Sequence, residues 1–270
     1  MSDPSPAPRR EPAETRRLVR LTVGYLGTRY AGWAKQAAGK TAGRATVQGL
    51  LEGLLGDLLQ GPVALTAAGR TDAGVHADAQ VVSFATTSAI PAAGIRRALA
   101  PRLPADVWVV DAEEAPPGFD ARWCARRRWY RYAVWRGPTP SPGWRGRCLE
   151  HPSPLDIGAM RLAASFLPGR RDVAAFATAW GPAERGSRST VRTVYVADWL
   201  ASDDCPLLLF EICADGFLRQ MVRTIVGTML WIGQGQWTPD RLQAALAAGD
   251  RRAAGPTAPA VGLTLARIEY

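Results

Sequence analysis

The chain has 270 residues, 47% of them hydrophobic, so it is long enough to bury one large core or two modest ones. It has no run of about 18 apolar residues, and its first residues are Pro-rich and charged, so we expect neither a membrane helix nor a secretory signal. The net charge of +9 is typical of a protein with a polyanionic partner, and an arginine-rich composition from a GC-rich genome produces the same charge.

The cysteines lack C-x-x-C spacing and are too few to form a disulfide framework for a chain of this length. They predict free thiols in a reducing compartment, and hence a cytoplasmic protein. Structural zinc lacks ligands at a suitable spacing, because the chain has only two histidines. These residues are Cys124, Cys148, Cys205, Cys213, His76 and His151.

The first half of the chain reads as alternating strands and helices. Residues 1–15 combine prolines with mixed charge, which predicts a disordered tail. Residues 18–25 alternate between apolar and polar side chains, which predicts a half-buried strand. Thr46 is expected to cap a helix whose stripe of leucines runs to Leu59. We then expect strands at 63–68 and 79–85, a helix at 92–100 and a strand at 106–112.

The second half repeats this order. We expect a strand at 127–135, a helix at 155–166, strands at 190–199 and 206–213, a helix at 217–232, an extra helix at 239–248 and a last strand at 262–270.

Two β-α-β-β-α-β halves predict a pseudo-duplicated α+β fold of ferredoxin-like (RRM-like) units, which pack into a central, mainly antiparallel sheet with a cleft between them. We predict an N-terminal catalytic half at residues 16–115, which carries the loop with Asp72, and a C-terminal half at residues 116–270, which completes the active-site cleft.

The densest candidate for chemistry is the run from Gly69 to Ala77, between two predicted strands. Its glycines allow a tight turn that projects Arg70, Thr71 and Asp72 from the strand ends. A cation two residues from a carboxylate favours the charged form, which can act as nucleophile or base. A hairpin with solvated charges fits the same spacing.

A metal site built from Asp72, His76 and Asp78 is a further alternative, although their spacing matches no common metal motif.

Gly69 to Ala77 resembles the signature of the TruA-type tRNA pseudouridine synthases, and further segments are similar to that family in the expected order over about residues 18–268. They are residues 25–33, 46–48, 119–122, 128–132, 217–223, 226–227 and 258–263. The chain departs from the family pattern at Leu26, Ala34, Arg219 and Gln220, which flank the motifs, so we expect altered RNA contacts there rather than lost catalysis.

The resemblance implies roles for three catalytic residues. Asp72 would be the nucleophile, attacking either C1′ of the ribose or C6 of the base. Tyr130 would stack on the extruded uracil and assist proton transfer at C5, and Arg223 would pair with Asp72.

The resemblance also implies residues that bind the substrate. Leu263 would lie beside the uracil, and Arg70 would support the flipped nucleotide or its phosphate. Arg126 and Arg128 belong to a basic strand interleaved with aromatic residues, a pattern that favours RNA contact.

The implied reaction converts uridine to pseudouridine at positions 38, 39 and 40 of the tRNA anticodon arm, after the base is flipped from its stack. The implied enzyme is a homodimer and needs no cofactor or metal. A non-catalytic RNA-binding module and a metal-dependent RNA hydrolase using Asp72 and Asp78 are the alternatives. The chain lacks the aromatic strand motif of the first, and activity in EDTA would separate the second.

Overall fold

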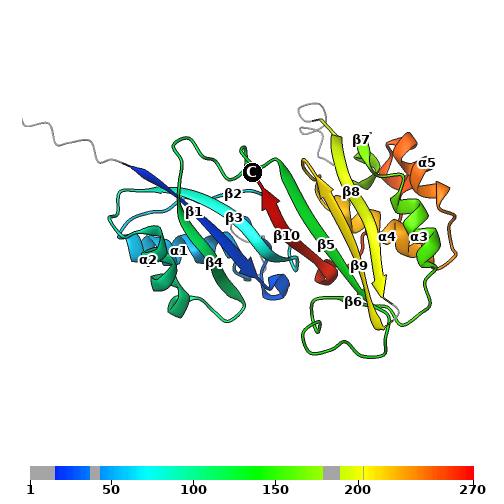
Figure 1. The fold of residues 1–270 in the computed structure, drawn as a ribbon, viewed down its shortest axis with the longest axis horizontal. Helices are drawn as coiled ribbons and strands as arrows, with labels where there is room; N and C mark the ends of the chain where they lie inside the picture. The colour runs from blue at the N-terminus through cyan, green and yellow to red at the C-terminus, as the bar shows by residue number, and fades with distance from the viewer. Residues whose placement is uncertain (1–15, 37–42, 179–188, 203) are drawn as a thin grey trace, which may run out of the picture.

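The computed structural model describes residues 16–36, 43–178, 189–202 and 204–270. The expected tail at residues 1–15 lies outside them. Ten strands form one sheet in the described part of the chain, and eight of these run in the order β4-β1-β3-β10-β5-β9-β8-β7 (Figure 1). This confirms the predicted α+β class with a mainly antiparallel sheet.

The first half holds one ferredoxin-like unit. Its strand order, β4-β1-β3 with the short β2 against β3, is that of a β-α-β-β-α-β fold. Its elements are β1 (Arg17–Tyr25), the 3₁₀ turn η1 (Gly27–Arg29), α1 (Val47–Leu59), β2 (Thr66–Ala67), β3 (His76–Thr86), α2 (Ala92–Leu99), the 3₁₀ turn η2 (Ala100–Arg102) and β4 (Val107–Ala115).

Helix α1 follows its sequence signals closely. The Thr46 hydroxyl accepts a hydrogen bond from the Gly49 amide at 3.2 Å, as an N-cap residue does. Leu51 and Leu55 on the apolar stripe are fully buried. The prediction of this helix and its cap is confirmed.

The second half repeats the arrangement as β10-β5-β9-β8. Its elements are β5 (Arg127–Trp135), β6 (Leu149–Glu150), α3 (Ile157–Ala164), β7 (Gly169–Asp172), the 3₁₀ turn η3 (Ala174–Phe176), β8 (Val191–Ser202), β9 (Cys205–Ala214), α4 (Met221–Gly233), α5 (Asp240–Ala248), the 3₁₀ turns η4 (Arg251–Ala253) and η5 (Ala260–Gly262), and β10 (Leu263–Glu269). The domain boundary between residues 115 and 116 stays a prediction, as does a cleft between the halves.

Strand β10 joins the two halves. It pairs in parallel with β3, with Thr264 opposite His76, and antiparallel with β5, with Leu265 opposite Tyr130. The start of β3, which follows the predicted catalytic loop, is therefore one strand away from the middle of β5.

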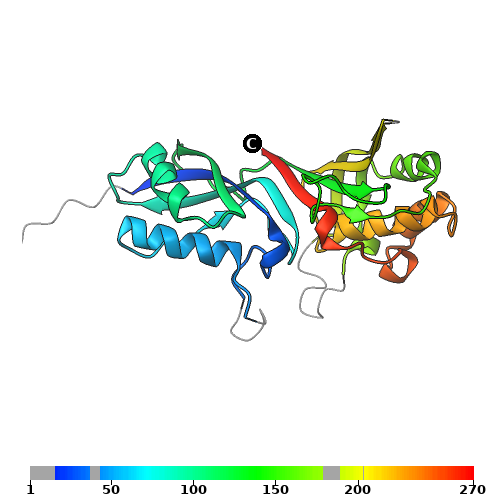
Figure 2. The ribbon, with the colours of Figure 1, turned by 90° about the horizontal axis from the view of Figure 1, so that it is seen from below.

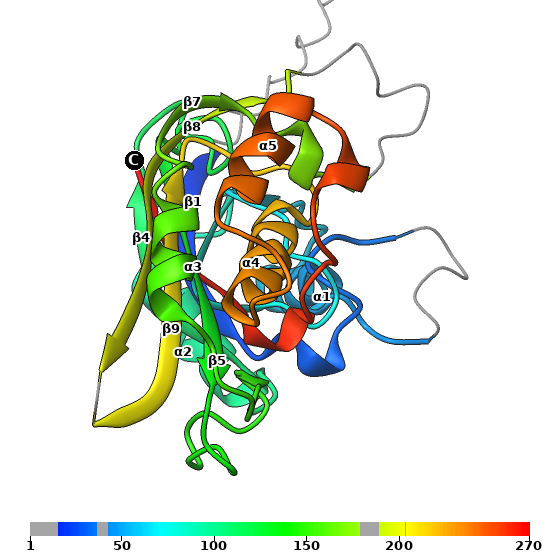
Figure 3. The ribbon, with the colours of Figure 1, turned by 90° about the vertical axis from the view of Figure 1, so that its right-hand side faces the viewer.

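Among the described residues, helices α1 to α5 lie on one face of the sheet, and no α-helix covers the other face (Figures 2 and 3). Side chains alternate along β5, so Tyr130 and Tyr132 point to the helix-covered face, where they join the main core. Arg131 and Ala133 point to the open face. In the described part of the chain, no helix has the length and apolar character needed to cross a membrane.

Several boundaries differ from the sequence prediction. Helix α4 begins at Met221 rather than at 217, because Gln220 adopts a left-handed conformation (φ 59°) that a helix cannot include. The strand predicted at 63–68 shrinks to Thr66–Ala67. Strands β6 and β7 were not predicted, since one has two residues and the other is fully exposed and carries no apolar alternation.

Candidate active site

The loop that carries Asp72 is fixed at both ends by hydrogen bonds. At its start, the buried Gln80 side chain pairs with Gly69, accepting from the amide at 3.3 Å and donating to the carbonyl at 2.6 Å. At its end, the Val75 amide donates to the Asp72 carbonyl at 3.2 Å. The tip of the loop therefore has a defined shape.

The segment that contains Tyr25 and Trp33 also forms hydrogen bonds with this loop. The Trp33 amide donates to the Thr71 carbonyl at 3.0 Å, and the Thr71 and Tyr25 hydroxyls lie 2.8 Å apart. Gly32 has a φ of +101°, and a Cβ there would lie 2.9 Å from the Thr71 carbonyl oxygen. Only glycine permits this approach without displacing the loop.

His76 links this loop to both halves of the protein. Its Nδ1 accepts a hydrogen bond from the Gly27 amide at 3.1 Å. Its Nε2 lies 3.0 Å from the Val261 carbonyl oxygen, which can only accept, so the ring is neutral and carries its proton on Nε2. Burial, the largest effect, lowers the pKa of the ring below its ordinary value, which agrees with this assignment.

Asp72 meets Arg223 from the other half of the chain. Arg223 Nη1 lies 3.3 Å from Asp72 Oδ2, while Arg223 Nε donates to the Ala258 carbonyl at 2.8 Å. The Asp72 side chain is 31% exposed and the Arg223 side chain 15%. The arginine is thus held at two points, and the carboxylate is oriented yet still open to a substrate.

Tyr130 is buried close to the same loop. Its ring meets Phe217 edge-on at 5.0 Å between centroids, and its hydroxyl lies 3.8 Å from where a Cβ on Gly69 would stand. Burial raises the pKa of the phenol, with the Tyr25 and Asp72 charges adding to the effect. The hydroxyl is therefore protonated at neutral pH and can donate a hydrogen bond.

A carboxylate, a paired arginine and a buried phenol thus lie at one loop. The family model of tRNA pseudouridine synthase matches residues 21–123 and 163–270 of this chain.

The chain belongs to the tRNA pseudouridine synthase family.

Relatives in this family align along nearly the whole chain. The tRNA pseudouridine synthase A of Moorella thermoacetica is 41% identical over 93% of this chain and 99% of its own length. That of Geobacter sulfurreducens is 40% identical over 94% of this chain and 100% of its own length. Among solved structures, a Cbf5-Nop10-Gar1 complex aligns at 12% identity over 92% of this chain and 48% of that chain, with a TM-score of 0.35, which is too low to support an argument.

The other residues that the sequence analysis predicted to bind the substrate lie in different settings. Arg70 is exposed on the loop, and Leu263 is buried at the start of β10 opposite Tyr132. Arg126 is exposed just before β5, with its amide bonded to the Glu269 carbonyl. Arg128 is half-buried, and its guanidinium donates to backbone carbonyls.

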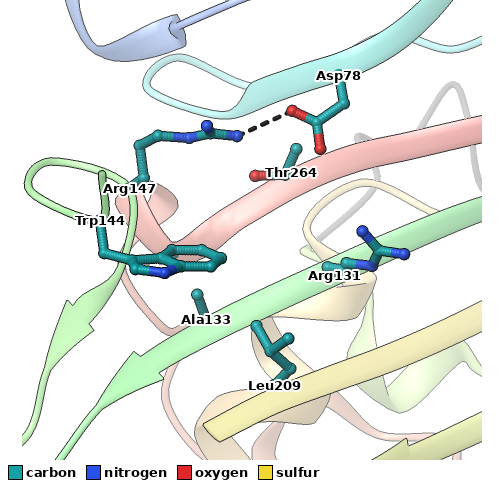
Figure 4. A pocket seen from close by; sticks show the side chains of 8 residues that line it. Asp78, Arg131, Ala133, Trp144, Arg147, Leu209 and Thr264 are labelled. Carbon is teal, nitrogen blue, oxygen red and sulfur yellow. Dashed lines mark hydrogen bonds and ion pairs between the residues drawn. The ribbon is translucent and has the colours of Figure 1, made fainter. Parts of the chain in front are cut away.

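A pocket on the open face of the sheet lies on the opposite side from Tyr130. Asp78 pairs there with Arg147 at 2.8 Å, and Trp144 and Arg131 also line it (Figure 4). The strand alternation places these side chains away from the core face of β5. The residues that line this pocket do not include Asp72, Tyr130 or Arg223.

The metal alternative required Asp72, His76 and Asp78 to converge. Asp78 is paired with Arg147, and both ring nitrogens of His76 are bonded to backbone groups. Among the residues that the structure describes, no three His, Cys, Asp or Glu side chains are arranged to hold a metal ion.

Sequence reasoning missed Tyr25 and Gln80 and considered His76 only as a metal ligand. Gln80 is a polar residue in the apolar part of a strand, and its full burial makes it informative. Such a residue needs a buried hydrogen-bond partner, and here the partner is the backbone of Gly69, where the Asp72 loop begins.

Proposed function

We propose that this member of the tRNA pseudouridine synthase family converts uridine to pseudouridine at positions 38, 39 and 40 of the tRNA anticodon arm, with Asp72 as the catalytic carboxylate. The observation that carries the proposal is the partly exposed Asp72 carboxylate, oriented by Arg223 on a loop that is bonded at both ends. The reaction class is supported by relatives named tRNA pseudouridine synthase A, which align with this chain over almost their whole length.

The reaction breaks the N1–C1′ bond, turns the uracil and forms a C5–C1′ bond, after which the C5 proton leaves and N1 gains a proton. Asp72 attacks C1′ or C6 through Oδ1, which makes no hydrogen bond to any described residue, while Arg223 holds Oδ2. The covalent bond to the carboxylate breaks again when the product forms. Every step is an internal transfer, so no redox cofactor is required.

The uracil must leave its helix before Asp72 can reach it. Tyr130 and Leu263, on the neighbouring strands β5 and β10, supply the apolar surface that receives the base. Base–aromatic stacking contributes about 1–3 kcal/mol. Arg70 and Arg126 are exposed and supply positive charge for the flanking phosphates.

The enzyme acts as a homodimer in this proposal, which the family resemblance implies. The open face of the sheet carries Tyr195 and Leu200, which are 42% and 44% exposed, and suits a second copy of the chain. Light scattering should give the mass of two chains, and a single-chain mass at micromolar concentration would contradict this point. A cytoplasmic location belongs to the same proposal, since the substrate is tRNA.

Tritium release from tRNA labelled at uridine C5 tests the function. We expect the wild-type protein to release tritium equally with and without EDTA, and to lose activity when positions 38, 39 and 40 are all cytidine. Release that survives this replacement would place the target elsewhere. Backbone cleavage of the tRNA that stops in EDTA, without tritium release, would support the hydrolase alternative. Binding of tRNA with neither tritium release nor cleavage would support the non-catalytic one.

A further inference from the structure

Arg128 occupies an unusual position beside the site. It lies on β5 two residues before Tyr130, on the same face of the strand. All three guanidinium nitrogens donate to backbone carbonyls: Nε to Ala68 at 2.9 Å, Nη2 to Arg122 at 2.9 Å, and Nη1 to Asp215 at 2.6 Å and to Ala125 at 3.4 Å.

These carbonyls belong to three separate segments that surround the active site. Ala68 directly precedes Gly69, where the Asp72 loop begins. Arg122 and Ala125 lie in the connection between β4 and β5, which joins the two halves of the chain.

The third segment leads to the partners of Tyr130 and Asp72. Asp215 follows β9 and stands two residues before Phe217, which packs on Tyr130. The same segment continues into α4, which carries Arg223. The Arg128 side chain therefore bonds to the start of the Asp72 loop, to the connection between β4 and β5, and to the segment that leads into α4.

We propose that Arg128 is a positioning residue for the isomerisation, and that its guanidinium holds the Asp72 loop in register with Tyr130 and α4 instead of contacting tRNA. The expectation from sequence grouped Arg128 with the RNA-binding arginines, because a basic strand is all that the sequence displays. Its donors are directed at backbone oxygens, and burial lowers the pKa of the group by withdrawing it from water.

A phosphate-binding role and a positioning role for Arg128 predict different experimental results. An arginine on a phosphate releases counterions, so its loss weakens tRNA binding and reduces the salt slope of log K by about 0.9. A positioning arginine leaves the affinity and the slope unchanged and lowers kcat, because the reacting groups lose their alignment.

The test compares Arg128→Lys and Arg128→Met with Arg126→Met, the exposed arginine two residues earlier. We expect Arg128→Lys, which keeps the charge but cannot donate to four carbonyls, to bind tRNA within twofold of wild type with an unchanged salt slope. We expect its kcat to fall roughly 10- to 100-fold at a temperature where circular dichroism shows it folded. Arg126→Met should instead weaken binding and reduce the slope.

This inference rests on the proposed function, so a second readout is independent of activity. Amide hydrogen exchange of peptides covering residues 66–75 and 213–220 should be about tenfold faster in the Arg128 variants, while the peptide covering α1 is unchanged. If the wild-type protein releases no tritium, the proposed function is wrong, and the hydrogen-exchange result still shows whether Arg128 holds these segments in place. If Arg128→Met does not fold, Arg128→Lys decides.

Two results would overturn the inference. One is a reduced salt slope with unchanged kcat and unchanged exchange, which would assign Arg128 to a phosphate. The other is a lower melting temperature with unchanged kcat in the folded variant, which would leave only a contribution to global stability.

Discussion

Arg223 and Asp72 are 151 residues apart in the chain and form one ion pair, with Nη1 3.3 Å from Oδ2. The arginine does not rely on the carboxylate alone, since its Nε is bonded to the Ala258 carbonyl. Ala258 is held in turn, because its amide donates to the Arg223 carbonyl at 3.0 Å. The direction of the guanidinium is thus fixed by the segment between α4 and β10 before any substrate binds.

Replacing Arg223 with methionine should lower kcat/KM while the protein stays folded. A hydrogen bond to a charged group contributes about 1.5–3 kcal/mol, which corresponds to a loss of roughly 10- to 150-fold. Steady-state tritium release measures it, with Arg241→Met on α5 as the control for an exposed arginine. Wild-type activity in Arg223→Met would show that the ion pair is not needed.

Gly227 should be essential to the position of α4. A Cβ at Gly227 would lie 1.8 Å from the Pro256 carbonyl oxygen, so Gly227→Ala must push α4 from the segment that holds Arg223. We expect a loss of about 1–3 kcal/mol in the free energy of unfolding by overpacking, and a lower kcat.

The matched control is Gly53→Ala on α1, where a Cβ meets nothing within 4 Å. Here alanine should stabilise the helix by about 0.5–1 kcal/mol. Urea unfolding of both variants gives the comparison, and equal stability changes would remove the packing argument.

His76 should make folding stability depend on pH. Its folded pKa is below the ordinary value of 6.5, chiefly through burial, with Arg147 lowering it and the Val261 bond and Asp78 raising it. Between pH 6.5 and the lower folded pKa, the unfolded chain binds a proton at this ring and the folded chain does not. The stability contribution is therefore complete above pH 6.5 and is lost as the pH falls through the folded pKa.

The measurement is the free energy of unfolding at pH 7 and at pH 5.5. Wild type should lose more stability between these values than His76→Gln, whose amide can also both accept and donate a hydrogen bond and does not titrate. His151→Gln is the control, because it leaves the His76 bonds to Gly27 and Val261 in place. Parallel pH curves for wild type and His76→Gln would contradict the assignment.

Tyr130 should contribute its ring and its hydroxyl separately. Tyr130→Phe keeps the stacking surface, so we expect unchanged tRNA affinity and a lower kcat. Tyr130→Ala should lose about 1–3 kcal/mol of binding in addition. Because the phenol pKa is raised, kcat of wild type should show no tyrosine ionisation up to pH 9. Unchanged kcat in Tyr130→Phe would exclude a role for the hydroxyl, with Tyr195→Phe as the control.

The fold could be read largely from local patterns. The alternation of β1 and the capped leucine stripe of α1 are local signals, and both elements formed as expected. The start of α4 could not be read in this way, because the left-handed Gln220 is a conformation that sequence periodicity does not encode. The site residues Asp72, Tyr130 and Arg223 came from a family resemblance, since spacing alone also fitted a solvated hairpin.

The contacts around the site depend on tertiary geometry that no local pattern contains. Gln80, His76 and Arg128 all bond to backbone groups of distant segments, so their side-chain types alone could not reveal their partners. The only sign of such contacts in the sequence is a polar residue within an otherwise apolar strand. Its role becomes clear only when the strand order brings the segments together.

The most direct test of the account is tritium release from C5-labelled tRNA by Asp72→Asn beside Asp78→Asn. Both variants lose one partly exposed carboxylate that is paired with an arginine, six residues apart in the chain. The account predicts that Asp72→Asn binds tRNA and releases no tritium, while Asp78→Asn releases it at close to the wild-type rate. Equal release by Asp72→Asn and wild type would contradict the central claim.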